Sequence, residues 1–416
     1  MSKLALDMTE CQRPLSIGCW EDRAVDLDAF AWLLTDEGQP VLAAAVGLGA
    51  TVSDDPLAAH AALRRTAPGI PPERLAVALS QAALRRAAVP KFGDLTARMY
   101  FTPEGLEQAT RLSVATHRAA RVRAFDARSV VDLGCGIGGD LVALATAGIT
   151  TAGVDLDPER VAVATANLAA LGLGGAVQVA DATTLDHSGF DVAFADPARR
   201  TARGRVFSTD HWSPPWPFVE SLLARDACVK AAPGIPHALV PDGVEAEWVS
   251  DHGEVKEAAL WAGRLATCAR RATVIGDGGL ATITDEDDPG APVRPVGGFL
   301  YEPDGAVVRA GLVTAVAAGV DGGLVDEHLA YVTSDASFRT PFARGYEVLE
   351  ELPYREKALR AALRERNVGR LTIKKRGVDV VPDQLRKRLA LSGDEEAVIV
   401  LTRVAGEGTC LLVRPF

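Results

Sequence analysis

The spacing of apolar residues changes twice along the chain and predicts three regions. In residues 1–125 apolar residues recur every three or four positions, which is typical of amphipathic helices. Short helices are expected in 28–34 and in 71–93, interrupted by proline and glycine. In 126–290 short apolar strands alternate with helices, a pattern typical of a parallel sheet with crossover connections. In 291–416 strands and helices follow one another in mixed order, which predicts an α+β region.

Two segments carry clear signals of local structure. In 101–125, Thr102 is a predicted N-cap and Pro103 suits the first helical position. We expect a single helix here, and its apolar face is formed by Ala109, Leu112, Ala115, Ala119 and Val122. At the end of the chain, the apolar runs on either side of "AGEG" (405–408) predict a β-hairpin.

A glycine-rich turn, "VVDLGCGIGGDL" (130–141), joins a predicted strand to a predicted helix. Its glycines fit G-x-G-x-x-G, the pattern of dinucleotide-binding turns, and also G-x-G-x-G through Gly134, Gly136 and Gly138. A second strand carries Asp155 near its end, roughly 20 residues after the glycines. Such a unit binds an adenosyl group, because the glycines let the backbone approach the ligand and the acid accepts hydrogen bonds from the ribose hydroxyls.

The charge of Asp132 indicates which of two adenosyl ligands fits this turn. A dinucleotide would place its pyrophosphate near this carboxylate at a cost in repulsion, whereas S-adenosylmethionine offers cationic ammonium and sulfonium groups. Two acidic residues later in the chain also fit S-adenosylmethionine. Asp181 ends a third predicted strand, where it can accept from an adenine amino group. Asp196 and Pro197 end a fourth strand at the carboxyl edge, where open α/β sheets place their sites.

Four motifs in this order resemble those of the class I S-adenosylmethionine-dependent methyltransferases: "VVDLGCGIGG", the acid of "GVDLDPERV", the acid of "VADA", and "DPARR". The resemblance implies an α/β fold with a Rossmann-like sheet, and S-adenosyl-L-methionine as the cofactor. It places Asp132, Gly134, Gly136 and Gly138 around the methionine part, Asp155 at the ribose and Asp181 at the adenine. Cys135 lies inside the turn and is interpreted as a small spacer rather than a nucleophile.

Segments outside this core narrow the resemblance. "MYFTPEGLEQAT", "HWSPPW" and "GFLYEPDGAVVRAGLV" resemble a bacterial methyltransferase group with a C-terminal THUMP-like domain, here about 340–416. The core and the "TPE" segment are also similar to the trimethylguanosine synthases, which act on the cap guanine of RNA. THUMP domains belong to RNA-modifying enzymes, so the resemblance implies an RNA substrate, with a base in rRNA or tRNA as the expected target. The C-terminal region is therefore expected to be ferredoxin-like or THUMP-like.

The turn after the fourth strand bears on the reaction. Methyltransferases that act on exocyclic amines of bases use Asp/Asn-Pro-Pro-aromatic, in which the acid or amide binds the amine and the ring stacks on the base. Here Asp196 and Pro197 match that pattern, but Ala198 and Arg199 replace the second proline and the ring. Arg199 can stack on a base or contact a phosphate. Asp196 is the best candidate for a general base, should the acceptor have to lose a proton.

Two nearby features allow alternative interpretations. Trp212 and Trp216 either supply the missing stacking surface or pack within a proline-rich loop. An Asp-Pro-Pro-Arg turn is typical of the RNA 5-methyluridine enzymes, which need a cysteine nucleophile, and Cys228 stands at a suitable distance. Its apolar neighbours favour a buried structural residue instead. The six cysteines form no C-x-x-C pair and the seven histidines form no cluster, so neither a disulfide framework nor a metal site is expected.

The charge distribution adds a candidate surface for RNA. The chain carries a net charge of −11, so a polyanion needs a local basic patch. Residues 344–388 contain 13 Lys and Arg against 7 Asp and Glu. The basic clusters are Lys374, Lys375 and Arg376, and Arg386, Lys387 and Arg388. Arg360 and Arg364 share one helix face, where pairing with Glu356 and Glu365 is the favoured interpretation.

Three classes of function are compatible with these features. The leading hypothesis is an RNA-modifying methyltransferase that binds RNA through the basic clusters. One alternative is a methyltransferase acting on a small molecule or protein, with the C-terminal region as a lid or an oligomerisation element. Another is a non-catalytic binder that has kept the cofactor pocket. The chain shows no apolar run typical of a signal peptide or of a membrane helix, so a cytoplasmic enzyme without membrane contact is expected. The oligomeric state stays open.

Overall fold

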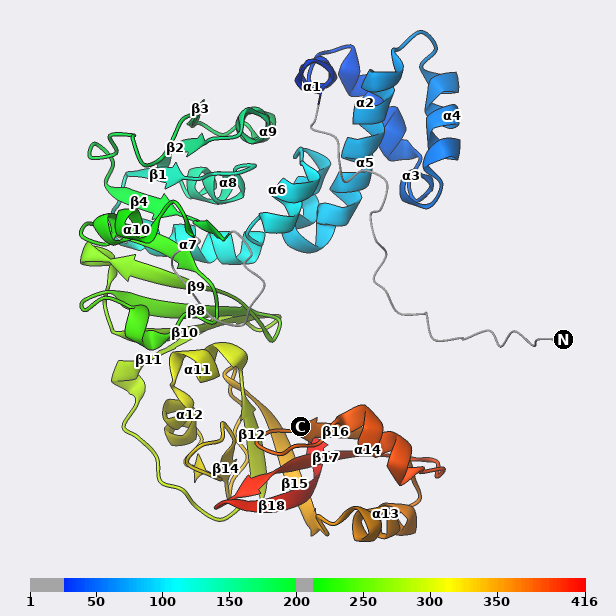
Figure 1. The fold of residues 1–416 in the computed structure, drawn as a ribbon, viewed down its shortest axis with the longest axis vertical. Helices are drawn as coiled ribbons and strands as arrows, with labels where there is room; N and C mark the ends of the chain where they lie inside the picture. Colours follow the sequence, from blue (N-terminus) through cyan, green and yellow to red (C-terminus); the bar gives the residue numbers. More distant parts are fainter. Residues whose placement is uncertain (1–25, 200–211) are drawn as a thin grey trace, which may run out of the picture. The chain divides into compact units, whose positions relative to one another are not determined.

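The computed structural model of the chain describes residues 26–199 and 212–416 (Figure 1). The chain divides into two compact units. One comprises Met1–Leu112 and Cys135–Asp181, and the other comprises Ser113–Gly134 and Ala182–Phe416. Among the described residues, no helix is long and apolar enough to cross a membrane.

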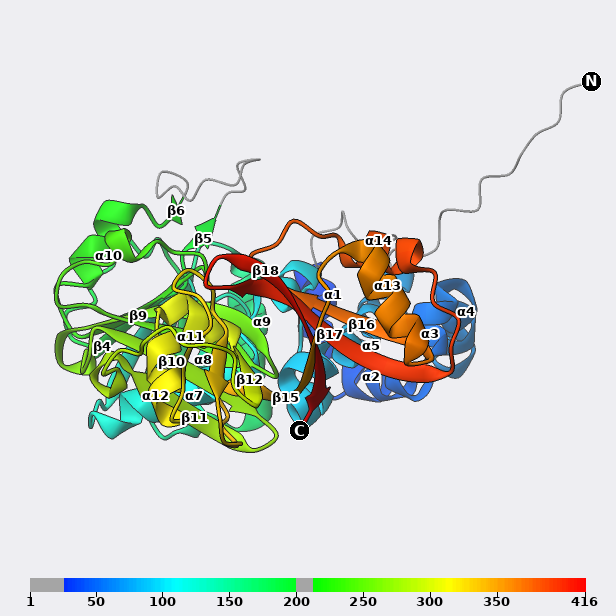
Figure 2. The ribbon, with the colours of Figure 1, turned by 90° about the horizontal axis from the view of Figure 1, so that it is seen from below.

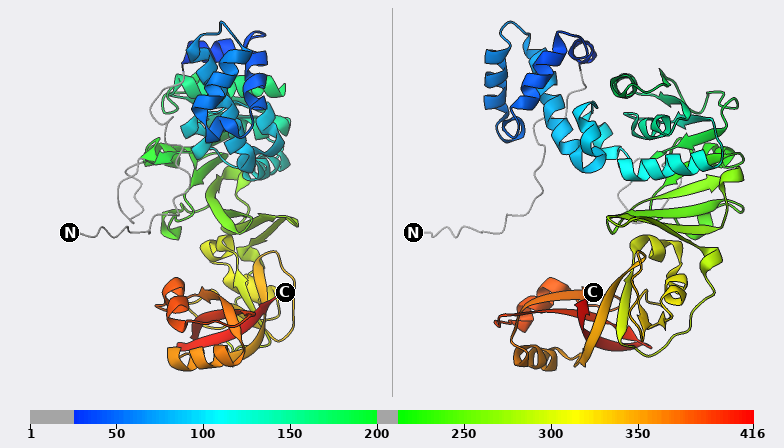
Figure 3. Two further views of the ribbon diagram at one scale, coloured as in Figure 1. Left: turned by 90° about the vertical axis from the view of Figure 1, so that its right-hand side faces the viewer. Right: turned by 180° about the vertical axis from the view of Figure 1, so that it is seen from behind.

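The described part of the N-terminal region is helical, and Figure 3 shows these helices in blue and cyan. They are α1 (Leu27–Leu33), α2 (Gly38–Gly47), α3 (Thr51–Asp54), α4 (Pro56–Thr66), α5 (Pro72–Phe92) and α6 (Pro103–Gln108). The long helix α5 packs against α1, α2, α3 and α4. The expectation of short helices in 71–93 is wrong, because α5 is continuous over 21 residues. Pro72 begins this helix, where a missing N–H costs nothing, whereas Pro90 lies inside it near the end and removes one backbone donor without breaking the helix.

The segment 101–125 forms two helices instead of the single helix that the pattern predicts. Thr102 caps α6 as expected, but α6 ends before α7 (Leu112–Ala124) begins. The ammonium group of Lys91 donates to three carbonyl oxygens at the end of α6, including that of Ala109 at 3.1 Å. Because a side chain satisfies these carbonyls, the helix can stop there. Ala109 therefore lies outside the α7 face on which it was expected.

A nine-stranded sheet forms the middle of the chain, in the order β11-β10-β8-β9-β7-β4-β1-β2-β3. Its strands are β1 (Ser129–Leu133), β2 (Thr150–Asp155), β3 (Ala176–Val179), β4 (Val192–Ala195), β7 (Ala227–Ala231), β8 (Glu245–Asp251), β9 (Glu254–Ala262), β10 (Arg270–Gly276) and β11 (Gly279–Thr284). The pairs β1/β4, β4/β7 and β2/β3 are parallel, as predicted. The helices between these strands are α8 (Gly139–Thr146), α9 (Pro158–Leu171) and α10 (Trp216–Leu222).

The other end of this sheet departs from the prediction of a parallel sheet. The pairs β7/β9, β8/β9 and β10/β11 are antiparallel, and β8/β10 is parallel. Only His252 and Gly253 separate β8 from β9, and only Asp277 and Gly278 separate β10 from β11. A parallel pair needs a crossover of a dozen or more residues, so connections this short can form only hairpins.

Two buried amides hold the extended segment that precedes α6. Gln81 on α5 accepts from the Phe101 N–H at 3.0 Å and donates to the Phe101 carbonyl at 2.7 Å. Asn167 on α9 accepts from the Tyr100 N–H at 2.7 Å and donates to the Tyr100 carbonyl at 3.1 Å. Asn167 also donates to the carbonyl of Ile137 in the glycine-rich turn, at 2.9 Å. These side chains satisfy buried backbone groups as a neighbouring strand would.

A second sheet, of seven strands in the order β13-β14-β12-β15-β18-β17-β16, lies in the C-terminal region. Its strands are β12 (Phe299–Pro303), β13 (Gly323–Leu324), β14 (Val332–Ser334), β15 (Ala343–Leu352), β16 (Val368–Lys375), β17 (Glu395–Val404) and β18 (Glu407–Pro415). The helices are α11 (Gly305–Ala310), α12 (Val313–Gly319), α13 (Glu356–Glu365) and α14 (Pro382–Leu389).

The C-terminal sheet has the local structure that the sequence predicts. Helices α13 and α14 pack beside β16 through a shared apolar core (Figure 2). The hairpin of β17 and β18 turns at Ala405 and Gly406, whose φ angles of 48° and 87° suit a two-residue hairpin turn. The predicted α/β class, with helices first and an α+β region last, is confirmed.

Helix α7 covers the central sheet with a face that is charged as well as apolar. Arg118 lies on this face and is only 2% exposed. Its guanidinium donates to both oxygens of Glu257 on β9, at 2.8 and 3.1 Å, and lies over the Phe194 ring at 4.5 Å. The apolar spacing of α7 predicted its buried face but not this ion pair.

A second buried carboxylate, Glu247 on β8, is held from several sides. It accepts from the Trp261 indole N–H at 2.8 Å and from Arg121 at 3.1 Å, and it lies 2.7 Å from His117 Nε2. Burial by itself raises the pKa of Glu247, but its hydrogen bonds and the charges of His117 and Arg121 outweigh burial and lower that pKa. Buried ion pairs therefore join the apolar contacts between α7 and this end of the sheet.

Replacing Arg118 by methionine is expected to lower the free energy of unfolding by about 3–5 kcal/mol, because Glu257 would stay buried without its cation. Urea unfolding measures this loss. The matched control is Arg123→Met, an exposed position on the same helix, where a change within about 0.5 kcal/mol is expected. The double variant R118M/E257M should recover most of the loss. A double variant as unstable as R118M would contradict this account.

Acid is expected to weaken the fold through Glu247. Because the folded state lowers its pKa below the ordinary value of 4.5, the stabilisation is complete above that value and is lost as the pH falls below it. In Glu247→Gln, the free energy of unfolding should therefore fall less steeply than in the wild type between about pH 5 and pH 3. Urea titrations at each pH measure both curves. Parallel curves would show that Glu247 does not couple folding to pH.

Candidate functional site

The glycine-rich turn after β1 has a backbone that only glycine adopts readily. Gly134, Gly136 and Gly138 have φ angles of 106°, 54° and 80°, a region that side chains disfavour. A Cβ at Gly138 would also lie 3.1 Å from the Cβ of Ala164 on α9. These three positions fit G-x-G-x-G, whereas Gly139 is the first residue of α8. The backbone at Gly134 and Gly136 is thus half-buried and free of side chains at the end of β1.

Asp155 ends β2 and is fixed by backbone groups. One carboxylate oxygen accepts from the Gly136 N–H at 2.9 Å, and the other accepts from the Asp157 N–H at 3.0 Å. Each carboxylate oxygen has a second lone pair, so Asp155 can still accept from two further donors. Asp181 is exposed and follows β3 by two residues, and the neighbouring Ala180 N–H donates to the Asp155 backbone carbonyl at 3.1 Å.

Two other residues of the turn region are buried. Asp132 lies within β1, opposite Phe194 of β4, and is 1% exposed. Cys135 is 7% exposed, and a Cβ at Gly153 on β2 would lie 3.0 Å from its sulfur. Cys135 is therefore packed against β2, which agrees with its interpretation as a small spacer.

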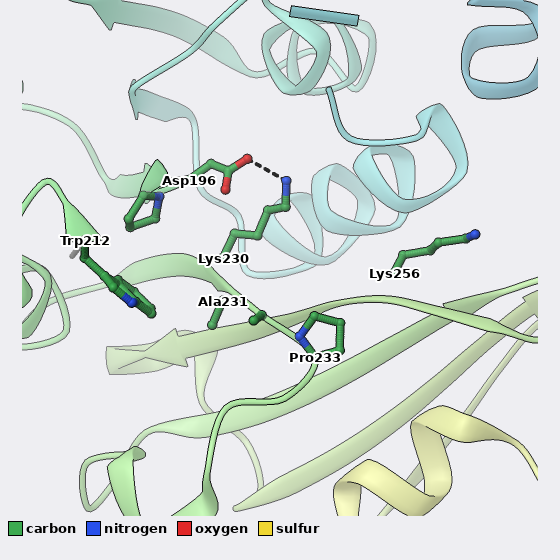
Figure 4. A pocket seen from close by; sticks show the side chains of 8 residues that line it. Asp196, Trp212, Lys230, Ala231, Pro233 and Lys256 are labelled. Carbon is green, nitrogen blue, oxygen red and sulfur yellow. Dashed lines mark hydrogen bonds and ion pairs between the residues drawn. The ribbon is translucent and has the colours of Figure 1, made fainter. Parts of the chain in front are cut away.

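The turn after β4 holds an ion pair that the sequence pattern did not reveal. In the parallel pair of β4 and β7, Ala195 lies opposite Val229, so Asp196 and Lys230 follow side by side. Lys230 Nζ lies 2.5 Å from Asp196 Oδ2 (Figure 4). A lysine at the end of an otherwise apolar strand is the signal that could have identified it. A Cβ at Gly134 would lie 3.8 Å from the Asp196 carbonyl oxygen, so Gly134 and Asp196 are neighbours.

A pocket opens beside this ion pair, and we call it the acceptor pocket. It is lined by Asp196, Pro197, Trp212, Lys230, Ala231, Ala232, Pro233 and Lys256. The indole of Trp212 forms one wall and packs edge-on against Trp216, with ring centroids 5.2 Å apart. Trp212 thus both packs and lines the pocket, whereas Trp216 supports it. The backbone of Arg199 pairs with Trp212 through β5 (Ala198–Arg199) and β6 (Trp212–Ser213), but the Arg199 side chain lies outside the described residues.

Cys228 has the environment of a structural residue. It lies on β7 and is fully buried, and burial raises the pKa of its thiol to about 12. A thiol held in its neutral form is a poor nucleophile, which disfavours the covalent mechanism of the 5-methyluridine enzymes. Over residues 26–199 and 212–416, no group of three His, Cys, Asp or Glu side chains is placed to hold a metal ion.

The first basic cluster is partly neutralised within the protein. Lys374 Nζ lies 2.5 Å from a carboxylate oxygen of Glu302 and 5.5 Å from the ring centre of Tyr346. Arg376 lies over the ring of Tyr331 at 5.3 Å. Lys375, by contrast, is exposed. The charges of Lys374 and Arg376 therefore take part in contacts within the protein, in addition to any contact with RNA.

The arginines of the second cluster and of α13 also have partners within the protein. Arg386 pairs with Asp383 at 2.7 Å, and Arg388 pairs with Glu356 at 2.8 Å. Lys387 is exposed. On α13, Arg360 donates to the Arg388 carbonyl at 2.6 Å and Arg364 donates to the Ala390 carbonyl at 3.0 Å, so both arginines cap the end of α14. Arg360 also contacts Glu356, as the pattern suggested.

Comparisons with known proteins agree with this geometry. A methyltransferase domain model matches residues 130–202, a THUMP domain-like model matches 343–415, and a domain of unknown function matches 26–88. Two relatives from Mycobacterium tuberculosis, strains CDC 1551 / Oshkosh and ATCC 25618 / H37Rv, are named as uncharacterized S-adenosylmethionine-dependent methyltransferases. Each is 39% identical over 336 residues, which cover 77% of this chain and 90% of the relative.

A solved structure from Porphyromonas gingivalis W83, named as a methyltransferase, has a similar fold. Its TM-score is 0.72, its identity is 22%, and the match covers 90% of this chain and 98% of that chain. At this identity the match supports the fold alone. The relatives and the matched domains go further: this chain belongs to the family of S-adenosylmethionine-dependent methyltransferases, uses S-adenosylmethionine as its cofactor, and has a THUMP-like domain at its C-terminal end.

Proposed function

We propose that this methyltransferase modifies a base in RNA, with rRNA and tRNA as the expected substrates. The observation that carries the proposal is the THUMP-like domain over residues 343–415, because domains of this kind belong to RNA-modifying enzymes. Exposed Lys375 and Lys387 lie in this domain, in a chain whose net charge is −11. Since acidic surface elsewhere repels a polyanion, a local basic surface decides where RNA docks.

The residues around the glycine-rich turn fit the cofactor. The turn offers backbone free of side chains, and Asp155 keeps lone pairs for the two ribose hydroxyls. In the proposed arrangement Gly134, Gly136 and Gly138 surround the methionine part, and buried Asp132 favours its cationic groups. Asp181 accepts from the adenine amino group. When bound, S-adenosylmethionine supplies an activated methyl group.

The acceptor pocket is the proposed site for the base. Asp196 orients the acceptor, Pro197 fixes the turn that carries it, and the Trp212 ring provides a flat apolar wall. Arg199, in the same turn, is proposed to contact the base or a phosphate. Because the methyl group is already activated, the main task of these side chains is to hold the acceptor in line with it.

One observation favours a second candidate function. Lys374, Arg386 and Arg388 are paired with carboxylates of the same domain, so this surface is less basic than its residue count indicates. A small molecule or a protein as acceptor, with the C-terminal domain as a lid or an oligomerisation element, is therefore the alternative. Binding measurements with RNA separate the two functions.

Asp155→Ala is expected to weaken S-adenosylmethionine binding about tenfold to a hundredfold, because a charged acceptor of two hydroxyl donors is worth roughly 1.5–3 kcal/mol. Isothermal titration calorimetry measures the affinity, and circular dichroism checks that the variant is folded. Asp155→Asn retains one acceptor oxygen and should fall between the wild type and Asp155→Ala. Unchanged affinity in a folded Asp155→Ala protein would remove Asp155 from the cofactor site.

Reversing the charges of exposed Lys375 and Lys387 to glutamate is expected to weaken RNA binding for all sequences, and to lower the salt slope by about one for each phosphate that the protein no longer neutralises. Fluorescence anisotropy over a range of salt concentrations measures both effects. The double variant R64E/R65E on α4 is a matched control, since both arginines are exposed and lie outside the THUMP-like domain. Equal effects in the two variants, or none in either, would count against this domain as the RNA anchor.

A further inference from the structure

The ion pair in the acceptor pocket places a cation next to the residue proposed to orient the acceptor. Lys230 and Asp196 point toward each other in Figure 4, with Nζ and Oδ2 2.5 Å apart. The Lys230 side chain is 17% exposed, so solvent screens its charge only in part. The parallel register of β4 and β7 creates this pairing, since Ala195 lies opposite Val229 and the next residue of each strand follows beside the other.

The second lysine of the pocket is directed elsewhere. Lys256 on β9 lines the pocket, but its ammonium pairs with exposed Glu254 and points away from Asp196 in Figure 4. Among the described residues that line the pocket, Lys230 is therefore the cation that faces Asp196. The other described lining residues are apolar or aromatic, which strengthens the field of this ammonium within the pocket.

This arrangement disfavours an exocyclic amine as the acceptor. An amine carries developing positive charge as its bond to the methyl carbon forms, and a neighbouring ammonium opposes that charge. The altered turn agrees with this conclusion, because Ala198 and Arg199 stand where amine-methylating enzymes have proline and an aromatic ring.

The same arrangement favours an acceptor that reacts as an anion. We propose, on the basis of the proposed function in RNA, that Lys230 selects a base with an acidic ring N–H, the imide or lactam group of uracil or guanine. The ring N–H passes its proton to the remaining oxygen of Asp196 and from there to water. The electron pair left on the ring nitrogen forms the N–CH3 bond as the S–CH3 bond breaks and its electrons stay on sulfur. The Lys230 ammonium balances the negative charge of the base until the methyl group arrives.

The methylated position tests this inference directly. The full chain is incubated with methyl-labelled S-adenosylmethionine and RNA from a strain that lacks the gene, and the RNA is digested to nucleosides and analysed by mass spectrometry. We expect the label on the ring nitrogen that carries the acidic N–H, N1 of guanine or N3 of uracil. Label at N7 of guanine, on an exocyclic amine, on a ribose hydroxyl or on a carbon atom would overturn the role of Lys230 and leave RNA methylation in place. RNA that gains no label, with a protein that binds the cofactor, would overturn the proposed function and this inference with it.

A pH profile distinguishes a role in ionising the acceptor from a structural one. Lys230→Met should lower the single-turnover rate at neutral pH roughly tenfold to a hundredfold. The rate should also continue to rise with pH beyond the point at which the wild type levels off, because the base then loses its proton without help. Lys230→Arg should restore much of the rate and the wild-type profile. S-adenosylmethionine affinity should stay unchanged in both variants.

Arg64→Met, at an exposed position of α4, removes a positive charge outside the pocket and outside the THUMP-like domain and is the control. It should have the rate and the pH profile of the wild type. A Lys230→Met protein with a lower rate but an unshifted profile would contradict the proposed role, and so would a Lys230→Arg protein no better than Lys230→Met.

Discussion

The parallel pairing of β4 with β1 on one side and β7 on the other is the constraint on which the site depends. Parallel strands end at the same edge of a sheet, so whatever follows each strand meets its neighbour there. β1 is followed by Gly134, β4 by Asp196, and β7 carries Lys230 at the same level. The backbone at Gly134 approaches the Asp196 carbonyl closely. One register therefore brings Gly134, the first glycine of the cofactor motif, to the ion pair of the acceptor pocket.

The sequence predicted well what depends on short stretches of chain. The glycine-rich turn requires left-handed backbone at Gly134, Gly136 and Gly138, and the glycines at these positions predict this conformation. The N-cap Thr102 and the hairpin at Ala405 are equally local signals. The alternation of short apolar strands with helices was sufficient to predict the parallel half of the sheet.

The rest could not be predicted because it depends on residues far apart in the chain. Lys230 comes to lie beside Asp196 only when β7 pairs with β4. Arg118 is buried only because Glu257 on β9 pairs with it. The helix over 101–125 divides because Lys91, from another helix, satisfies its carbonyls. For the basic clusters the sequence predicted too much positive charge, because a count of charges ignores partners such as Glu302 on β12 that neutralise them.

We propose that this edge of the sheet holds the cofactor by Asp155 and presents its methyl group to the acceptor pocket. The most direct measurement is a crystal structure of the full chain with S-adenosylhomocysteine. The account predicts that both ribose hydroxyls donate to the Asp155 carboxylate and that the sulfur faces the side of the pocket where Asp196 and Lys230 lie. A ribose bound away from Asp155, or a sulfur directed away from this ion pair, would contradict it.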